Sequence, residues 1–201
     1  MTKLSLQKLQ VNLATHYYEK TIEGIYLSAT QAKVHLEKEL KQQANDITVD
    51  NSLSKEEKAY LIDTLSDECF LSEKTTELAG EMMVVAFYKT IEIAIKDMLK
   101  FSGLFTEAQI RSFYRIAELK KQVSKKICNI EKLNGFNAYD ELRCINNCIK
   151  HSGKVNDELS KYPNWKKGSK LSNLDKKYWR LKAGVNGFVK SLQKEILAKM
   201  V

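Results

Sequence analysis

The sequence is short of the two residues that most often interrupt helices, since its 201 residues include one proline and eight glycines. This scarcity favours long helices with few breaks. The longest apolar run, at residues 82–87, is far shorter than the roughly 18 residues typical of a membrane span. The first twenty residues mix charged and polar side chains, unlike a signal peptide. We therefore expect neither a membrane span nor a secretory signal.

Recognisable cysteine and glycine motifs are also lacking. The four cysteines form no C-x-x-C pair, and without a secretory signal they indicate reduced thiols in a cytoplasmic protein. No glycine-rich phosphate loop and no G-x-S-x-G motif occurs, so nucleotide hydrolysis and serine-hydrolase chemistry have no support. We expect no cofactor.

Positive charge is plentiful but unevenly placed. The formal net charge is +8, and residues 161–201 hold eleven Lys and Arg against Asp175 and Glu195. The first 160 residues hold 22 basic and 23 acidic side chains. Aromatic residues are interleaved with this basic segment, as in proteins that follow a phosphate backbone and stack on bases. A lysine-rich helix face exposed to solvent is the simpler interpretation, and both stay open.

Apolar residues recur at spacings of three and four, and no strand-like alternation occurs. The pattern predicts one domain, residues 1–201, folded as an all-α bundle of five or six helices. Ser54 and Glu57 form a capping box, Thr106 and Asn137 are predicted N-caps, and Gly103, Gly135 and Gly153 are predicted stops. The predicted helices include one long N-terminal helix over 4–45, one over 55–65 that the capping box opens, others over 73–101 and 107–134, one from 138 to about 151, and a last helix over 174–200.

The helix before Gly153 carries an unusual row of polar residues. On a helical wheel Leu142, Ile145 and Ile149 form an apolar stripe, with Tyr139 on its flank. Off that stripe, three polar side chains follow one another at intervals of four: Arg143, Asn147 and His151. Lys150 lies at the edge of this row, and Asn146 lies close to the apolar flank.

Such a row could cleave RNA. Attack by a ribose 2′-hydroxyl needs one group that accepts a proton, one that delivers a proton, and donors that stabilise the charged phosphorane. A histidine can fill either proton-transfer role near neutral pH, and arginine or asparagine can hold phosphate oxygens. One chain supplies one such histidine, and a two-fold dimer would supply the second.

The segment "YDELRCINNCIKHSG", together with the preceding helix "FYKTIEIAIKDMLKFSG", resembles a HEPN domain over roughly residues 81–159. In that family a helical bundle carries an R-N-x-x-x-H motif near a helix end, usually at a dimer interface. Many members are metal-independent ribonucleases of toxin–antitoxin, abortive-infection or other phage-defence systems. The resemblance therefore implies a homodimer that acts on RNA, with an antitoxin or another defence protein as a possible partner.

Asn147 and His151 match the asparagine and histidine of that motif, while Asn146 stands at its arginine position. The chain's arginine is displaced to Arg143, eight residues before His151, which is a helix rise of about 12 Å. The resemblance gives His151 the acid–base role and makes Asn147 its orienting or phosphate-binding partner. We expect Arg143, of the same or of the second subunit, to stabilise the transition state, and Lys150 and Asn146 to bind substrate.

Three other interpretations of these residues stay open. The domain could bind RNA or a partner protein without cleaving, or it could be a purely structural helical adaptor. Cys144, Cys148 and His151 could also suggest a zinc site, although three ligands from one helix without a fourth make poor geometry.

Overall fold

The structure is a computed structural model that describes residues 2–200. These residues form an all-α fold, with seven α-helices, two short 3₁₀ helices and no β-structure beyond one isolated bridge. This confirms the predicted fold class with more helices than expected. The helices are α1 (Lys3–Leu13), α2 (Glu19–Val49), α3 (Lys55–Phe101), α4 (Glu107–Ser112), α5 (Ile116–Lys126), η1 (Ile130–Lys132), α6 (Phe136–His151), η2 (Leu159–Lys161) and α7 (Leu174–Lys199).

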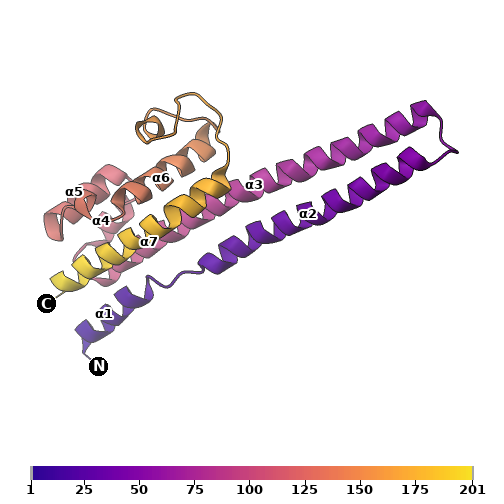
Figure 1. Cartoon of the computed structure of the whole chain (residues 1–201). Coiled ribbons are helices and arrows are strands. Elements are labelled where there is room, and N and C mark those ends of the chain that lie inside the picture. The colour runs from indigo at the N-terminus through magenta and orange to yellow at the C-terminus, as the bar shows by residue number, and fades with distance from the viewer. Residues whose placement is uncertain (1, 201) are drawn as a thin grey trace.

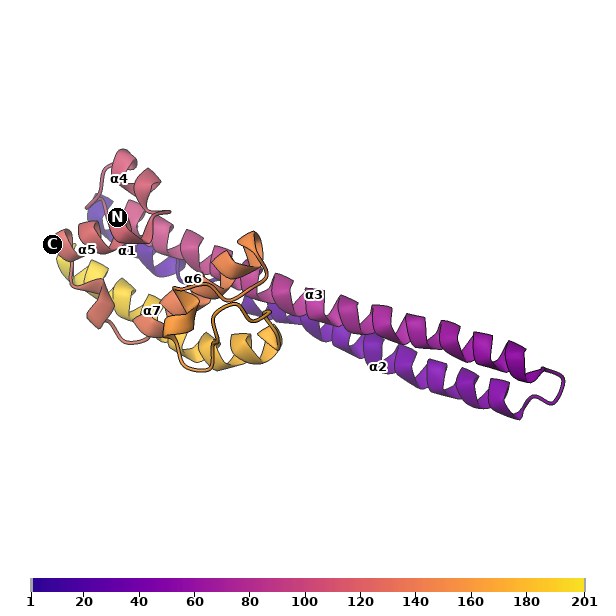
Figure 2. The same cartoon turned by 90° about the horizontal axis from the view of Figure 1, so that it is seen from above.

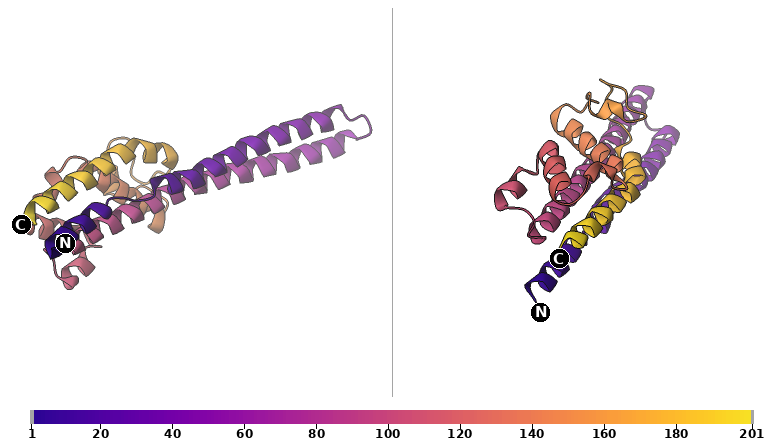
Figure 3. Two further views of the ribbon diagram at one scale, coloured as in Figure 1. Left: turned by 90° about the horizontal axis from the view of Figure 1, so that it is seen from below. Right: turned by 90° about the vertical axis from the view of Figure 1, so that its left-hand side faces the viewer.

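The molecule has two visibly different parts (Figure 1). The second half of α3 packs with α1 and α4–α7 into a body, whereas α2 and the first half of α3 leave that body as a long antiparallel hairpin (Figure 2). Both ends of the described chain lie on the body, away from the hairpin tip (Figure 3). The core follows this division, since buried apolar residues are dense in α3 beyond Ala79 and in α5–α7.

The predicted long N-terminal helix is wrong, because the chain breaks between α1 and α2 at residues 14–18. The Thr15 hydroxyl donates to the Asn12 carbonyl, and the His16 ring lies 3.1 Å from the same oxygen. Both side chains join the Thr15 backbone N–H at the Asn12 carbonyl, where the helical hydrogen-bond pattern ends. Tyr17 then donates to the side chain of Asn186 at 2.6 Å, which fixes the break against α7.

The two helices expected between Ser54 and Phe101 are one helix, α3, of 47 residues. Its predicted capping box is confirmed: the Glu57 backbone N–H donates to the Ser54 hydroxyl, and the Ser54 N–H donates to the Glu57 carboxylate. Gly103 follows its end with a positive φ of 70°, as expected of a helix stop.

The helix predicted over 107–134 is divided into α4, α5 and the 3₁₀ turn η1. Thr106 caps α4 as expected, with a capping box to Gln109. The helix ends near Phe113, whose buried ring packs edge-to-face on Phe105 at 5.3 Å. Asn137 is not an N-cap, because α6 begins at Phe136, two residues earlier than predicted, with Gly135 before it. The last predicted helix is confirmed as α7.

No helix among residues 2–200 combines the length and the apolar character needed to cross a membrane.

Candidate functional site

Close contact with α7 positions helix α6. Gly135, at φ 81°, lies so near Gly184 that a methyl group there would overlap the Gly184 carbonyl oxygen and approach the Phe188 nitrogen to 2.8 Å. One turn later Tyr139 stacks on Phe188, with ring centroids 4.7 Å apart. The sequence-encoded glycines therefore let two helix backbones meet, and aromatic packing fixes the start of α6.

The apolar stripe of α6 lies in the core as predicted, since Tyr139, Leu142 and Ile145 are buried. Ile149 is half-buried. Cys144 and Cys148 are buried as well. Burial raises the pKa of the Cys144 thiol to about 12, so this cysteine stays protonated.

Arg143 lies inside the protein rather than on an open face, with 9% of its surface exposed. Its guanidinium donates to Asp140 at 2.8 Å, to Glu158 at 3.1 Å and to the Cys144 sulfur at 3.3 Å. Burial lowers the pKa of Arg143, but the hydrogen bond and the charge of Asp140 outweigh burial and raise it, so the group is a permanent cation. The wheel placed Arg143 off the core, and the segment after α6 buries it there.

That segment, residues 152–173, folds back along α6 and is tied to it at a second point (Figure 2). Glu141 is buried and accepts from the Trp165 indole at 2.7 Å and from the Arg180 guanidinium. Tyr162 donates to Asp140 at 2.7 Å. Acidic side chains on α6 thus hold the loop from two sides.

The Asp140 contacts predict a pH dependence of stability. Burial raises the pKa of this carboxyl, but hydrogen bonds from Arg143 and Tyr162 and the Arg143 charge lower it below its usual value. A depressed pKa contributes stability above the unfolded-state value near 3.9, and that contribution is lost as the pH falls through the lower folded-state value. We expect Asp140→Asn to reduce the free energy of unfolding by about 1–2 kcal/mol at pH 7. Urea unfolding should show this difference shrinking below about pH 3.5, and a constant difference would argue against the ion pair.

The remaining polar residues of the row lie at different depths. Asn146 is buried, and its Oδ1 has no hydrogen-bond partner among the described residues. Asn147 is half-buried, while Lys150 and His151 are exposed. Of the residues expected at the site, the structure therefore brings Asn147, Lys150 and His151 to the surface at the end of α6.

The chain turn after His151 brings further lysines to this end. Gly153, at φ 63°, donates to the Cys148 carbonyl at 2.9 Å, which confirms its predicted role as a helix stop. Residues 153–155 then pair with 168–171, where Leu171 donates to the Gly153 carbonyl at 3.0 Å. We call the exposed lysines that this pairing gathers around the α6 end the basic rim: Lys150, Lys154, Lys166, Lys167 and Lys170.

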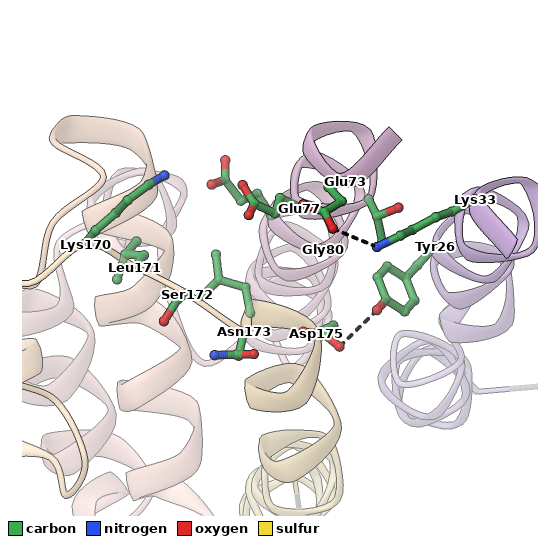
Figure 4. A pocket seen from close by; sticks show the side chains of 13 residues that line it. Tyr26, Lys33, Glu73, Glu77, Gly80, Lys170, Leu171, Ser172, Asn173 and Asp175 are labelled. Atoms are coloured by element: carbon green, nitrogen blue, oxygen red, sulfur yellow. Dashed lines mark hydrogen bonds and ion pairs between the residues drawn. The ribbon is translucent and has the colours of Figure 1, made fainter. Parts of the chain in front are cut away.

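A cavity lies beside the basic rim, lined in part by Lys170, and His151 is not among its lining residues (Figure 4). It has a volume of about 500 Å³ and lies where residues 170–175 face the base of the hairpin. Its side chains carry both charges, as Lys33 lies 4.0 Å from Glu73 and Tyr26 donates to Asp175 at 2.9 Å. These pairs satisfy one another, so the cavity offers no single-sign site.

A zinc site has little support from this arrangement. Cys144 and Cys148 are buried beneath the loop, whereas His151 is exposed at the helix end. Within residues 2–200, no group of three or more histidine, cysteine or acidic side chains is placed to hold a metal ion.

The sequence interpretation did not identify the partners of Arg143, nor did it predict that lysines of the basic segment return to the end of α6. The spacing of Asp140 and Arg143, three residues apart on a helix, is a signal that could have revealed that pair. Nothing comparable marks Glu158 or Lys170, which reach α6 only through the turn at Gly153.

Comparison of this chain with protein-family models, with curated proteins and with solved structures found no match.

Proposed function

We propose that this protein is a metal-independent endoribonuclease of the HEPN type, with His151 as the group that transfers protons. The observation that carries the proposal is the position of His151, exposed on the last residue of α6. Asn147 lies one turn earlier on the same side of the helix and is half-buried, so it can hold the imidazole or a phosphate oxygen.

The basic rim supports RNA as the substrate. Lys150 and Lys154 flank His151 along the chain, and the pairing of residues 153–155 with 168–171 adds Lys170. The Lys166 and Lys167 side chains are exposed nearby, and Lys167 forms only an exposed ion pair with Asp157. Exposed lysines around a proton-transfer group attract a phosphate backbone and weaken their hold on it as salt rises.

The proposed reaction breaks a phosphodiester by internal attack. His151 of one copy removes the proton from a ribose 2′-hydroxyl, whose oxygen then bonds to the adjacent phosphorus. The 5′-oxygen leaves and takes a proton from the second copy's imidazolium, which yields a 2′,3′-cyclic phosphate and a 5′-hydroxyl. A homodimer is part of the proposal because one chain offers a single histidine at this position.

A second function, binding of RNA or a partner protein without cleavage, is favoured by the state of Arg143. Its guanidinium is buried and paired with Asp140 and Glu158. It cannot stabilise a phosphorane without leaving these partners, and removing a charge from a buried pair costs several kcal/mol. If the protein does cleave RNA, lysines of the basic rim have to supply the positive charge that stabilises the phosphorane.

Purified protein incubated with single-stranded RNA in EDTA distinguishes the two functions. Cleavage supports the nuclease, and salt-sensitive binding without cleavage supports the silent binder. If the protein is a toxin or acts by abortive infection, as the resemblance suggests, its expression should also arrest growth, and a partner that neutralises it should restore growth.

The basic rim gives a separate prediction for RNA affinity. Replacing Lys166, Lys167 and Lys170 together by glutamate should weaken RNA binding at least 10-fold at low salt and reduce the slope of log affinity against log salt by about 2. Filter binding at several salt concentrations measures both quantities. Lys55, Lys125 and Lys190, which lie on α3, α5 and α7, provide a matched triple control that should leave the slope unchanged.

A further inference from the structure

The hairpin of α2 and α3 has too little core of its own. Of the residues from Glu19 to Leu78, only Leu40 is buried. Helical stability in proteins comes mainly from burying an apolar face, so a helix pair this long with one buried residue leaves apolar surface without a partner. Figures 1 and 2 show that the body covers only the base of this hairpin.

The uncovered apolar residues form an ordered face. On α3, Leu71, Thr75, Leu78 and Met82 follow at spacings of four, three and four, and Leu71, Leu78 and Met82 are 63%, 55% and 55% exposed. A stripe with the same spacings runs along the neighbouring α2 through Ile25, Ala29, Ala32 and Leu36. Such spacing is the pattern of a coiled-coil seam, and it lies in addition to the seam that joins α2 to α3.

Between the two stripes lies a groove of about 360 Å³. Most of its lining side chains are small or apolar, and two are charged: Ala29, Ala32, Leu36, Leu71, Ser72 and Thr75, with Lys33 and Glu68. A groove of this kind can accept large apolar side chains from a facing helix, as holes accept knobs in helix packing. Met82 of another copy has the required size and exposure.

We propose that a second copy of this chain covers this face, packed antiparallel about a two-fold axis near Leu78. In this arrangement, a residue that comes a given number of positions before Leu78 in one copy lies level with the residue that comes the same number of positions after Leu78 in the other copy. Asp67, eleven positions before Leu78, lies level with Lys89 of the other copy, eleven positions after it. Lys74 lies level with Met82 of the other copy, which is next to Glu81 in the chain. Symmetry repeats both attractive pairs, so the charges suit a second copy in this register.

Lys74 and Lys89 already form ion pairs within their own helix, but these pairs do not prevent them from pairing with the other copy. Lys74 bonds Glu77 at 2.7 Å and Lys89 bonds Glu92 at 3.3 Å, both within one helix and with exposed lysines. Such pairs contribute little and are easily replaced. In this register Asp63 lies level with Ile93 of the other copy, next to Glu92, and Lys96, which bonds Glu92 at 2.9 Å, offsets that like charge.

The body supplies a further matching surface. Tyr60, 73% exposed on the same side of α3, lies level with Lys96 of the other copy. Next to Lys96 is a hollow of about 390 Å³, lined by Leu13, Tyr18, Ile93 and Asp97 among others. The hairpin tip of each copy thus reaches an apolar hollow on the body of the other. This assignment concerns self-association alone and does not depend on RNA cleavage.

Sedimentation equilibrium of the full chain tests the interface. The wild-type protein should be dimeric at micromolar concentration, and Leu78→Glu should raise the dimer dissociation constant at least about 100-fold, because the axis places the two carboxylates together. Leu27→Glu, an exposed apolar site on the other side of α2, should leave the constant unchanged. Circular dichroism should show that both variants keep their helix content.

Two variants test the register. Lys74→Glu and Glu81→Lys should each weaken the dimer about 10-fold, and the double exchange should restore it. In a Cys69→Ser background, Leu78→Cys should form a cross-linked dimer on mild oxidation, whereas Leu27→Cys should not. A monomeric wild type, or a dimer insensitive to Leu78→Glu, would overturn the proposal. Measuring RNA cleavage on the same samples tests the nuclease proposal separately from the dimer interface.

Discussion

Replacing His151 by alanine should abolish RNA cleavage, with a rate loss of about 10²- to 10⁴-fold. The imidazole is exposed at the end of α6 and contributes no packing that the fold needs, so the variant should unfold like the wild type. Gel analysis of labelled single-stranded RNA in EDTA measures the rate. His35 is the matched control, because it is also an exposed helical histidine, and its removal should change nothing.

The position of His151 also makes its role separable from RNA binding. His151→Ala should keep its affinity for RNA within a few-fold, because the lysines of the basic rim are untouched. A variant that cleaves at the wild-type rate would assign the proton transfer to another group. Loss of both binding and cleavage would instead indicate a structural role for this histidine.

Replacing Gly135 by alanine should destabilise the protein by about 2–4 kcal/mol, the second large effect that we expect. The added methyl group would meet the Gly184 backbone, and the positive φ adds strain. For a chain of this size, the melting temperature should fall by about 5–15 °C. Thermal unfolding followed by circular dichroism measures this shift.

Gly168 provides the control for the backbone strain alone. Its φ is 80°, nearly that of Gly135, but a methyl group there would meet no atom within 4 Å. Gly168→Ala should therefore cost only about 1–2 kcal/mol. Equal losses in the two variants would mean that the α6–α7 contact is not tight at Gly135.

Local sequence signals predicted much of the fold, because helix ends depend on a few neighbouring residues. The capping box at Ser54, the cap at Thr106, the stop at Gly153 and the helix of residues 174–199 all have the expected form. The break between α1 and α2 was missed because it depends on a hydrogen bond from Tyr17 to Asn186, 169 residues away. Periodicity within a helix carries no information about such a contact.

At the candidate site, too, the prediction succeeded for residues that follow the helical period and failed where a distant segment determines burial. The wheel correctly placed Tyr139, Leu142 and Ile145 in the core, because they follow the helical period. It failed for Arg143, since a wheel assumes that one side of the helix meets the core and the other meets water. The loop after Gly153 provides a second cover for α6, and Glu158 closes it over the guanidinium. How deeply each side chain of the Arg143–Asn147–His151 row is buried therefore depends on a segment that the sequence of the helix does not specify.

The chemistry of the RNA ends tests the central claim most directly. Wild-type protein should cleave single-stranded RNA in EDTA and leave 2′,3′-cyclic phosphate and 5′-hydroxyl ends, which mass spectrometry of the fragments identifies. Intact RNA under these conditions, or products with 3′-hydroxyl and 5′-phosphate ends that need added metal ions, would contradict a histidine-based cleavage at the end of α6.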